Sequence, residues 1–235
     1  MLISTADPGP LRDERELIAQ LPLAAAARAL ELGCGTARQT AVLARSGKFA
    51  SIVALEVDQV QHALNLKLAD LPSVRFGLGG AEAIPAADAS FDAVFLFKSL
   101  HHVPLDLLDQ AFAEMWRVLA PGGLVYISEP IFGGDYNEIL RLFHDEQRVR
   151  EAAFAATRAA VESGQFELVS QSFFLAPVRY RSFAEFEEKV IGVTHTAHHL
   201  SPELHRQVRE KFEAYLGERG AEFEAPFRVD LLRKV

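Results

Sequence analysis

Residues able to bind a nucleoside cluster around two glycines near the start of the chain. Glu31 precedes Gly33 and Gly35 in the run Leu30-Glu31-Leu32-Gly33-Cys34-Gly35-Thr36, and Glu56 ends the next apolar run. Glycine has no Cβ, so the backbone can approach a ligand closely. An acid at the end of a following strand can accept hydrogen bonds from ribose hydroxyls. The spacing therefore predicts a site for a nucleoside-containing cofactor.

Two residues argue against a dinucleotide at this site. The dinucleotide fingerprint requires glycine or alanine at its last position, where this chain has Arg38. Glu31 would also repel a pyrophosphate. A carboxylate at this place instead suits a cationic group, such as the ammonium of an amino acid attached to adenosine. S-adenosylmethionine fits that description, whereas NAD does not, so an NAD-dependent oxidoreductase is disfavoured.

Residues 21–130 resemble a class I S-adenosylmethionine-dependent methyltransferase of the kind that methylates small molecules. Five segments match in the order and spacing of that family: the cofactor loop at Leu30-Glu31-Leu32-Gly33-Cys34-Gly35-Thr36, the ribose-binding strand end at Ile52-Val53-Ala54-Leu55-Glu56-Val57-Asp58, the adenine loop at Ala81-Glu82-Ala83-Ile84-Pro85 with Ser90-Phe91-Asp92-Ala93-Val94, the Leu100-His101-His102-Val103 segment, and Arg117-Val118-Leu119-Ala120-Pro121-Gly122-Gly123.

The resemblance implies a set of residues around the cofactor: Glu31, Gly33, Cys34, Gly35, Glu56, Val57, Gly80, Ala81, Glu82 and Lys98. Two positions depart from the family pattern. Ala37 stands where glycine is common, and Gly80 stands where an aspartate commonly contacts the adenine amino group. The amide of Ala81 and the side chain of Glu82 are then left to read the base.

His101 and His102 follow the predicted fourth strand, at the edge where ligands bind in open parallel sheets. Methyl transfer needs the acceptor and the methyl group held in line, and a base is needed only if the acceptor must lose a proton. Either histidine is a candidate base near neutral pH. The alternative is that one bonds a loop carbonyl while the other faces solvent.

Further polar residues are expected to bind the substrate: Ser99, Glu129, Tyr136, His144, His195, His198 and His199. For Glu129 the alternative is hydrogen bonding to nearby backbone amides. The last three histidines have helical spacing that could surround zinc, but no cysteine or carboxylate lies close to them in sequence. We therefore expect no metal site.

The elements that position these residues alternate along the first 130 residues. Strands are predicted at Ala27–Leu32, 51–56, Val74–Leu78, Phe91–Phe97 and 124–128, and helices at 11–21, 36–45, 59–69 and 105–119. Thr36 is expected to cap its helix, and Trp116 is expected to pack in the core. Strands alternating with helices predict a doubly wound α/β fold with a mostly parallel sheet.

The pattern changes beyond Pro130. A long helix is expected at 136–162, a strand at Phe166–Tyr180, two helices at 183–190 and 202–216, and a final strand at 222–235. Pro226 lacks an N–H, so regular pairing is expected only after it. By the resemblance, the sheet is seven-stranded and Rossmann-like with its last strand antiparallel. Residues 131–164 and 181–220 then form a helical cap on a single domain, 1–235.

Composition narrows the function classes. The 235 residues carry a formal net charge of −8 without a basic run, which disfavours nucleic-acid substrates. Hydrophobic residues make up 49%, so long disorder is not expected. Cys34 is the single cysteine, and its predicted role is a small side chain beneath the cofactor. Neither an export signal nor a membrane span is evident, which predicts a cytoplasmic protein.

The predicted function is transfer of a methyl group from S-adenosyl-L-methionine to an oxygen, nitrogen or carbon atom of a small molecule. The alternative is a non-catalytic cofactor-binding protein with a regulatory or assembly role, which the glycine at position 80 favours slightly. The acceptor and the oligomeric state are not readable from the sequence.

Overall fold

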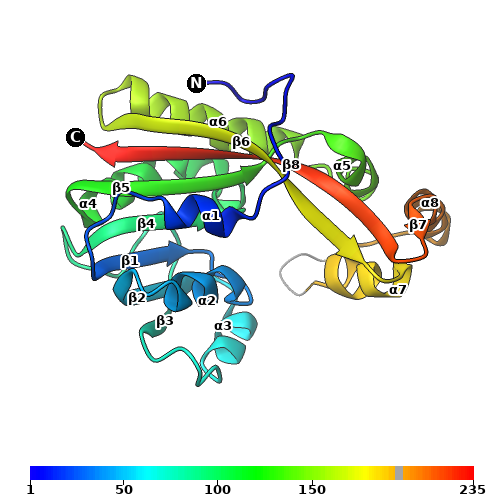
Figure 1. Cartoon of the computed structure of the whole chain (residues 1–235), viewed down its shortest axis with the longest axis horizontal. Coiled ribbons are helices and arrows are strands. Elements are labelled where there is room, and N and C mark those ends of the chain that lie inside the picture. The colour runs from blue at the N-terminus through cyan, green and yellow to red at the C-terminus, as the bar shows by residue number, and fades with distance from the viewer. Residues whose placement is uncertain (194–197) are drawn as a thin grey trace.

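The computed structural model describes residues 1–193 and 198–235, and its centre is a twisted sheet (Figure 1). The strands are ordered β3-β2-β1-β4-β5-β8-β6, and the two-residue β7 pairs with β8. The first five are parallel, whereas β8 is antiparallel to both of its neighbours. This confirms the predicted fold class. The bounds are β1 Ala27–Leu32, β2 Phe49–Glu56, β3 Val74–Leu78, β4 Phe91–Phe97, β5 Leu119–Pro130, β6 Phe166–Tyr180, β7 Leu216–Gly217 and β8 Gly220–Lys234.

The central strands form because apolar residues occupy both faces of the sheet. In β4, every residue except Asp92 is buried. Leu30 of β1 pairs with Val53 of β2 on one side and Val94 of β4 on the other. This register brings the carboxyl ends of β1, β2 and β4 to one edge of the sheet, where the predicted cofactor residues lie.

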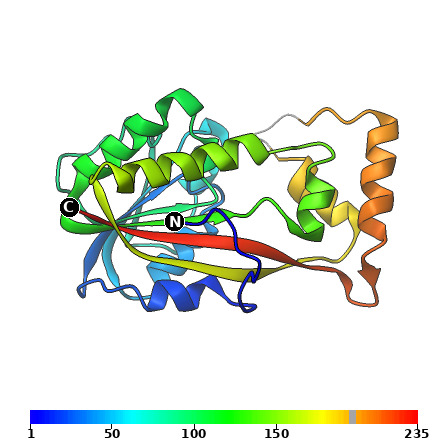
Figure 2. The same ribbon diagram turned by 90° about the horizontal axis from the view of Figure 1, so that it is seen from above.

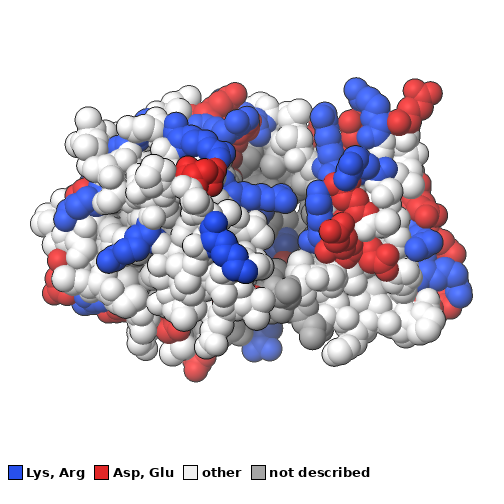
Figure 3. Space-filling view, turned by 90° about the horizontal axis from the view of Figure 1, so that it is seen from below, with Lys and Arg blue, Asp and Glu red and all other residues white. Residues whose placement is uncertain are grey.

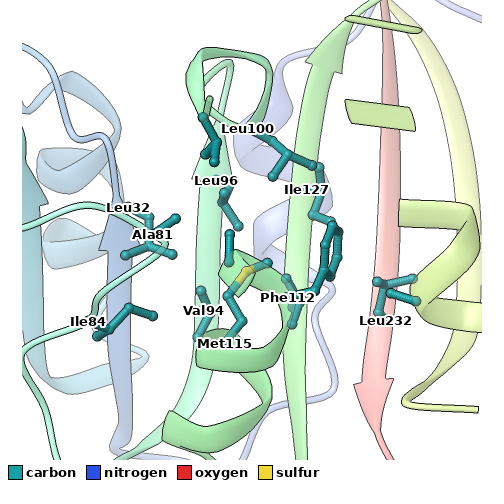
Figure 4. Packing of buried hydrophobic residues seen from close by; sticks show 14 of the residues in the cluster. Leu32, Ala81, Ile84, Val94, Leu96, Leu100, Phe112, Met115, Ile127 and Leu232 are labelled. Carbon is teal, nitrogen blue, oxygen red and sulfur yellow. The ribbon is translucent and has the colours of Figure 1, made fainter. Parts of the chain in front are cut away.

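Helices cover both faces of the sheet (Figure 2). On one face, α4 (Leu108–Val118) and α6 (Gln147–Glu162) contact each other and bury a core that includes Met115 and Phe112 (Figure 4). On the other face, α1 (Glu14–Ala19) and α2 (Arg38–Arg45) bury Ile18 and Leu43 against the strands. The short α3 (Gln59–Asn65) follows β2.

Two local predictions were wrong. Thr36 does not cap α2: the helix begins at Arg38, and the residue before it, Ala37, has a left-handed backbone and makes no side-chain capping bond. Trp116 is not a core residue, because 39% of it is exposed. It lies on the outer side of α4, where the Lys234 ammonium sits 3.8 Å from the ring centroid.

The predicted long helix at 136–162 is two helices, α5 (Gly134–Leu140) and α6, because the chain turns between them. Helix α6 packs on the sheet face beside α4, whereas α5 contacts β8. Helices α7 (Phe183–Phe186), with a π-helical turn at Glu187–Ile191, and α8 (Pro202–Glu213) join α5 around the outer ends of β6 and β8. Together α5, α7 and α8 form what we call the cap, beyond the carboxyl ends of the parallel strands (Figures 1 and 2).

Pairing was predicted to begin only after Pro226, and this prediction was wrong. Strands β6 and β8 pair through Pro226 as far as Tyr180 and Ala221. The Pro226 carbonyl accepts a hydrogen bond from the Ile131 amide, 2.9 Å away. In an antiparallel sheet, the nitrogen and the carbonyl of one residue point toward the same neighbouring strand. The Pro226 carbonyl points toward the β5 side, so the N–H that proline lacks would also point toward β5 and not toward β6. The β5 ladder ends at Phe227, so no pair is lost.

Among the described residues, none of the helices combines the length and apolar character that a bilayer crossing requires.

Candidate cofactor and acceptor site

The glycine turn after β1 is held against the ends of two neighbouring strands. The amides of Gly33 and Cys34 donate to the Leu55 carbonyl at 3.0 and 2.9 Å. Gly33 has φ +72°, and a Cβ there would lie 2.7 Å from the Cβ of Ser99. Gly35, at φ +50°, has open space at its Cβ position. The first glycine is needed for close packing, and the second leaves room for a ligand.

Glu56 holds this turn to the end of β2. One carboxylate oxygen accepts from the Gly35 amide at 2.7 Å, and the other from the Val57 and Asp58 amides at 2.8 and 3.0 Å. The side chain is buried. Each carboxylate oxygen has two lone pairs, so accepting capacity remains for ribose hydroxyls on the oxygen that takes a single amide.

Glu31 is a buried carboxylate with one oxygen that lacks a hydrogen-bond donor. It is 1% exposed, and its Oε2 has no hydrogen-bond partner among the residues that the structure describes. Burial raises the pKa of this carboxyl to about 8, with a further contribution from the charge of Glu56, while the nearby Thr40 hydroxyl acts in the opposite direction. A carboxylate in this state is stabilised by an incoming cation, which is the chemistry of the S-adenosylmethionine ammonium group.

In the adenine loop, the Glu82 side chain lies next to Gly80, the residue that departs from the family pattern. A Cβ added to Gly80 would lie 2.3 and 2.4 Å from the carboxylate oxygens of Glu82. Glu82 therefore fills the space where an aspartate side chain at position 80 would begin. Its backbone is fixed by Gln110, whose Nε2 donates to the Glu82 carbonyl at 2.8 Å. Ala81 beside it is buried in the core.

Glu14 of α1 is a polar residue at this site that the sequence analysis missed. It accepts hydrogen bonds from Gln39 of α2 at 2.9 Å and from the Tyr126 hydroxyl of β5 at 3.2 Å. Burial raises the pKa of Glu14, while the positive charge of Lys98 opposes that rise. Lys98 itself is exposed and has φ +56°. No sequence signal connects a helix at residue 14 to strands eighty or more residues later.

Cys34 matches the predicted small buried side chain. It is 6% exposed, burial raises the pKa of its thiol, and its sulfur accepts a hydrogen bond from Asn65 at 3.5 Å. A thiol kept protonated in this way is a poor nucleophile.

The two histidines after β4 have different surroundings. His101 is buried, with Nδ1 bonded to Glu129 and Nε2 3.5 Å from a Glu146 oxygen. Burial alone would lower the pKa of His101, but these two carboxylates raise it to about 9. His102 is exposed, with its ring centroid 4.1 Å from that of His101. Because its raised pKa keeps it protonated, His101 is a poor acceptor of protons near neutral pH.

Several predicted substrate residues make structural contacts. The Ser99 hydroxyl donates to the Leu32 carbonyl at 2.7 Å. Glu129 is buried and accepts from the Leu100 amide at 2.9 Å, which matches the alternative of backbone bonding. The hydroxyls of Tyr136 and Tyr180 lie 2.7 Å apart.

Glu146, which the sequence analysis missed, contacts His101 and His144. Its Oε1 lies 2.8 Å from His144 Nε2, and its Oε2 accepts from Arg150 at 2.5 Å. Although burial opposes it, the hydrogen bonds from His101 and His144 and the charge of Arg150 lower the pKa of Glu146. The His198 ring centroid lies 4.7 Å from that of His144. His199 is exposed, and His195 lies outside the described residues.

A hollow separates the sheet from the cap in the view of Figure 3. Lysine and arginine side chains lie on both sides of it, and aspartate and glutamate side chains lie beside them on the cap side. The hollow lies beyond the carboxyl ends of the parallel strands, where ligands bind in sheets of this kind.

The sheet order, the glycine turn and the buried acids Glu31 and Glu56 define a class I methyltransferase fold with a site suited to S-adenosylmethionine. Residues 30–127 match the family model described as a methyltransferase domain. These residues therefore match a methyltransferase domain, which supports the resemblance to class I S-adenosylmethionine-dependent methyltransferases seen in the sequence.

Curated relatives are methyltransferases. Methyltransferase GfsG of Streptomyces halstedii is 31% identical over 144 residues, covering 58% of this chain and 50% of the relative. Trans-aconitate 2-methyltransferase of Variovorax paradoxus is 32% identical over 119 residues, covering 51% and 44%. An uncharacterised methyltransferase of Mycobacterium tuberculosis is 41% identical over 108 residues, covering 46% and 42%. The alignments span about half of these relatives or less.

Solved structures share the fold over nearly the whole chain. The YcgJ protein of Bacillus subtilis has a TM-score of 0.66 at 17% identity, covering 94% of this chain and 97% of that one. A putative methyltransferase of Bacillus halodurans has a TM-score of 0.64 at 17% identity, covering the same shares. The cyclase SpnF has a TM-score of 0.57 at 23% identity, covering 94% and 79%.

Proposed function

We propose that this protein transfers the methyl group of S-adenosyl-L-methionine to an oxygen, nitrogen or carbon atom of a small molecule. The observation that carries the proposal is Glu31, a buried carboxylate with a partnerless oxygen beside a glycine turn. Such a group disfavours pyrophosphate cofactors and favours a cationic amino acid joined to adenosine.

The cofactor residues divide by the part of the ligand they match. Glu31 holds the ammonium, Lys98 the carboxylate of the same amino acid, and Glu56 the ribose hydroxyls. The Ala81 amide and the Glu82 side chain read the adenine. When bound, the cofactor supplies an activated methyl group, so the protein mainly has to orient the acceptor and exclude water.

The acceptor enters through the hollow between the sheet and the cap, and it carries a negatively charged group such as a carboxylate. Support comes from the basic side chains next to the hollow, which on the sheet side are more numerous than the acidic ones (Figure 3). Two of the relatives are trans-aconitate 2-methyltransferases, enzymes whose names specify an acidic substrate. We also infer that His102, and not the ion-paired His101, accepts a proton where the acceptor must lose one.

We infer that the non-catalytic alternative is the weaker of the two. It rested on the glycine at position 80, and the Glu82 carboxylate occupies the space next to that glycine. We expect the protein to act in the cytoplasm and without nucleic acid, in keeping with its net charge of −8.

A two-stage experiment tests the proposal. Calorimetry with S-adenosylmethionine, its demethylated product and NAD should give binding of the first two only. A panel of carboxylic acids, phenols and amines is then screened for release of demethylated cofactor. Turnover of carboxylic acids above the others supports the acidic acceptor. Binding without turnover of any panel member would favour the non-catalytic alternative, and absence of cofactor binding would refute both.

A further inference from the structure

Three side chains outside the cofactor site converge at the junction between the sheet and α6. His101 and His102 belong to the 3-10 turn Leu100–His102 after β4, and Glu146 immediately precedes α6. One ligand atom from each, a ring nitrogen or a carboxylate oxygen, lies within 4.8 Å of the others. The proposed methyl transfer requires no such convergence.

The spacing between two of these atoms suits a metal site as well as a long hydrogen bond. His101 Nε2 and Glu146 Oε1 are 3.5 Å apart. Hydrogen bonds between nitrogen and oxygen are usually about 2.7–3.2 Å long. In a tetrahedral zinc site, bonds of about 2.0–2.2 Å place neighbouring ligand atoms roughly 3.3–3.5 Å apart. A small cation therefore fits between the two groups with little movement.

The surrounding contacts orient both ligands. Glu129 takes the Nδ1 side of His101 and is itself fixed by the Leu100 amide at 2.9 Å, so Nε2 faces Glu146. A carboxylate behind a histidine is the usual support of a metal-bound imidazole. Arg150 pairs with Oε2 of Glu146, which leaves Oε1 facing the histidines.

We propose that His101, His102 and Glu146 bind a divalent transition-metal ion of the zinc type. Two imidazoles and one carboxylate favour zinc, cobalt or nickel over magnesium or calcium, which prefer oxygen ligands. His144 Nε2 is hydrogen-bonded to the same Glu146 oxygen at 2.8 Å and helps to hold that carboxylate in place. His102 is exposed, so the ion has a route in from solvent.

The ion would connect the turn after β4 to the start of α6. On binding, His101 Nε2 gives up its proton to solvent and bonds the metal through that lone pair. His102 cannot accept a proton from an acceptor while its own lone pair is bound. The site therefore excludes the base role of His102 while the metal is present. The metal proposal does not rest on methyl transfer, because it is argued from the spacing of the three ligands alone.

Binding is measured on the full chain after treatment with a chelator, using Zn²⁺ in calorimetry and Co²⁺ in visible absorption. We expect one ion per chain and the intense absorption of tetrahedral cobalt. His102→Ala and Glu146→Gln should each weaken binding by at least about tenfold, and Glu129→Gln by about 10- to 100-fold through the loss of orientation.

The matched control is His205→Ala. His205 Nε2 lies 2.6 Å from Glu187, so it is another histidine–carboxylate pair, located in the cap. Its replacement should leave the binding unchanged. Thermal melts establish that each variant is folded, and the exposed His102 provides a decisive variant even if replacement of the buried groups unfolds the protein. Absence of stoichiometric binding to the wild type, or equal binding by His102→Ala, would overturn the proposal.

Discussion

Protonation of Glu31 should couple cofactor binding to pH. Its pKa of about 8 in the folded protein, against an ordinary 4.5, means that about nine in ten molecules hold a proton there at pH 7. The cofactor ammonium requires the carboxylate form. Binding at pH 7 should therefore release close to one proton, at a cost of about 1.4 kcal/mol, and affinity should rise up to about tenfold between pH 6 and 7.

Calorimetry in phosphate and in Tris measures this release, because the two buffers differ in ionisation enthalpy. We expect the apparent enthalpy of the wild type to vary with the buffer by an amount equal to about 0.9 protons. Glu31→Gln should remove that variation and weaken binding, whereas Glu16→Gln, which changes an exposed acid on α1, should leave it intact. Equal proton release by the wild type and Glu31→Gln would refute the reasoning.

The same shift affects stability without cofactor. The folded state binds the Glu31 proton more tightly than the unfolded state, so this contribution is complete below about pH 4.5. It is lost progressively as the pH rises to about 8. Glu31→Gln should abolish this dependence, so its melting temperature should exceed that of the wild type increasingly from pH 5 to 8. A difference in melting temperature between the two proteins that stays constant from pH 5 to 8 would contradict the raised pKa of Glu31.

Three further predictions follow from the contacts. Glu56→Ala should weaken cofactor binding by about ten- to a hundredfold in calorimetry, because a charged acceptor worth about 1.5–3 kcal/mol is lost; unchanged affinity would refute the ribose assignment. Truncation after Glu224 should give insoluble or molten protein, since it removes most of β8 from the sheet; a truncated chain that melts like the full one would show otherwise. With an acceptor in hand, His102→Asn should lower the turnover of the metal-free protein by about 10²–10⁴, whereas His101→Asn should mainly lower the melting temperature. Equal turnover by the wild type and His102→Asn would remove the base.

The sequence predicted the central strands well because their signals are local. Val74–Leu78 and Phe91–Phe97 have the predicted bounds, since runs of apolar residues buried on both faces leave little ambiguity. The final strand is also confirmed, with Phe227, Val229 and Leu231 buried in one core cluster. Wherever the period and the burial of a segment agreed, the element followed.

The errors arose where tertiary contacts override local preference. Trp116 fits the apolar stripe of its helix, yet Lys234 from the end of the chain covers it at the surface. Thr36 is a good capping residue, but the left-handed Ala37 separates it from the helix. Pro226 was expected to interrupt pairing, and only the strand order reveals that its missing donor faces the end of β5.

The candidate site divides in the same way. The cofactor residues follow from a motif, because Glu31 and Glu56 end consecutive strands and neighbouring parallel strands end together. In the cluster around Glu146, the sequence indicated His101, His102 and His144 as site residues but not Glu146 itself, which lies in an unpredicted break between helices. Nothing in the local sequence marks that break as functional.

The ribbon of β6 and β8 has a consequence for how the cap can vary. Beyond Phe227 the two strands leave β5 and continue to Tyr180 and Ala221, where α5, α7 and α8 pack around a core of their own. The fully buried residues of the cofactor half belong to other clusters, although Tyr136 and Val178 pack against both the cap core and one of these. A change of side chains at the far end of this ribbon alters the acceptor side without repacking the cofactor side. The two halves can therefore accumulate substitutions independently, with one conserving the methyl donor while the other explores new acceptors.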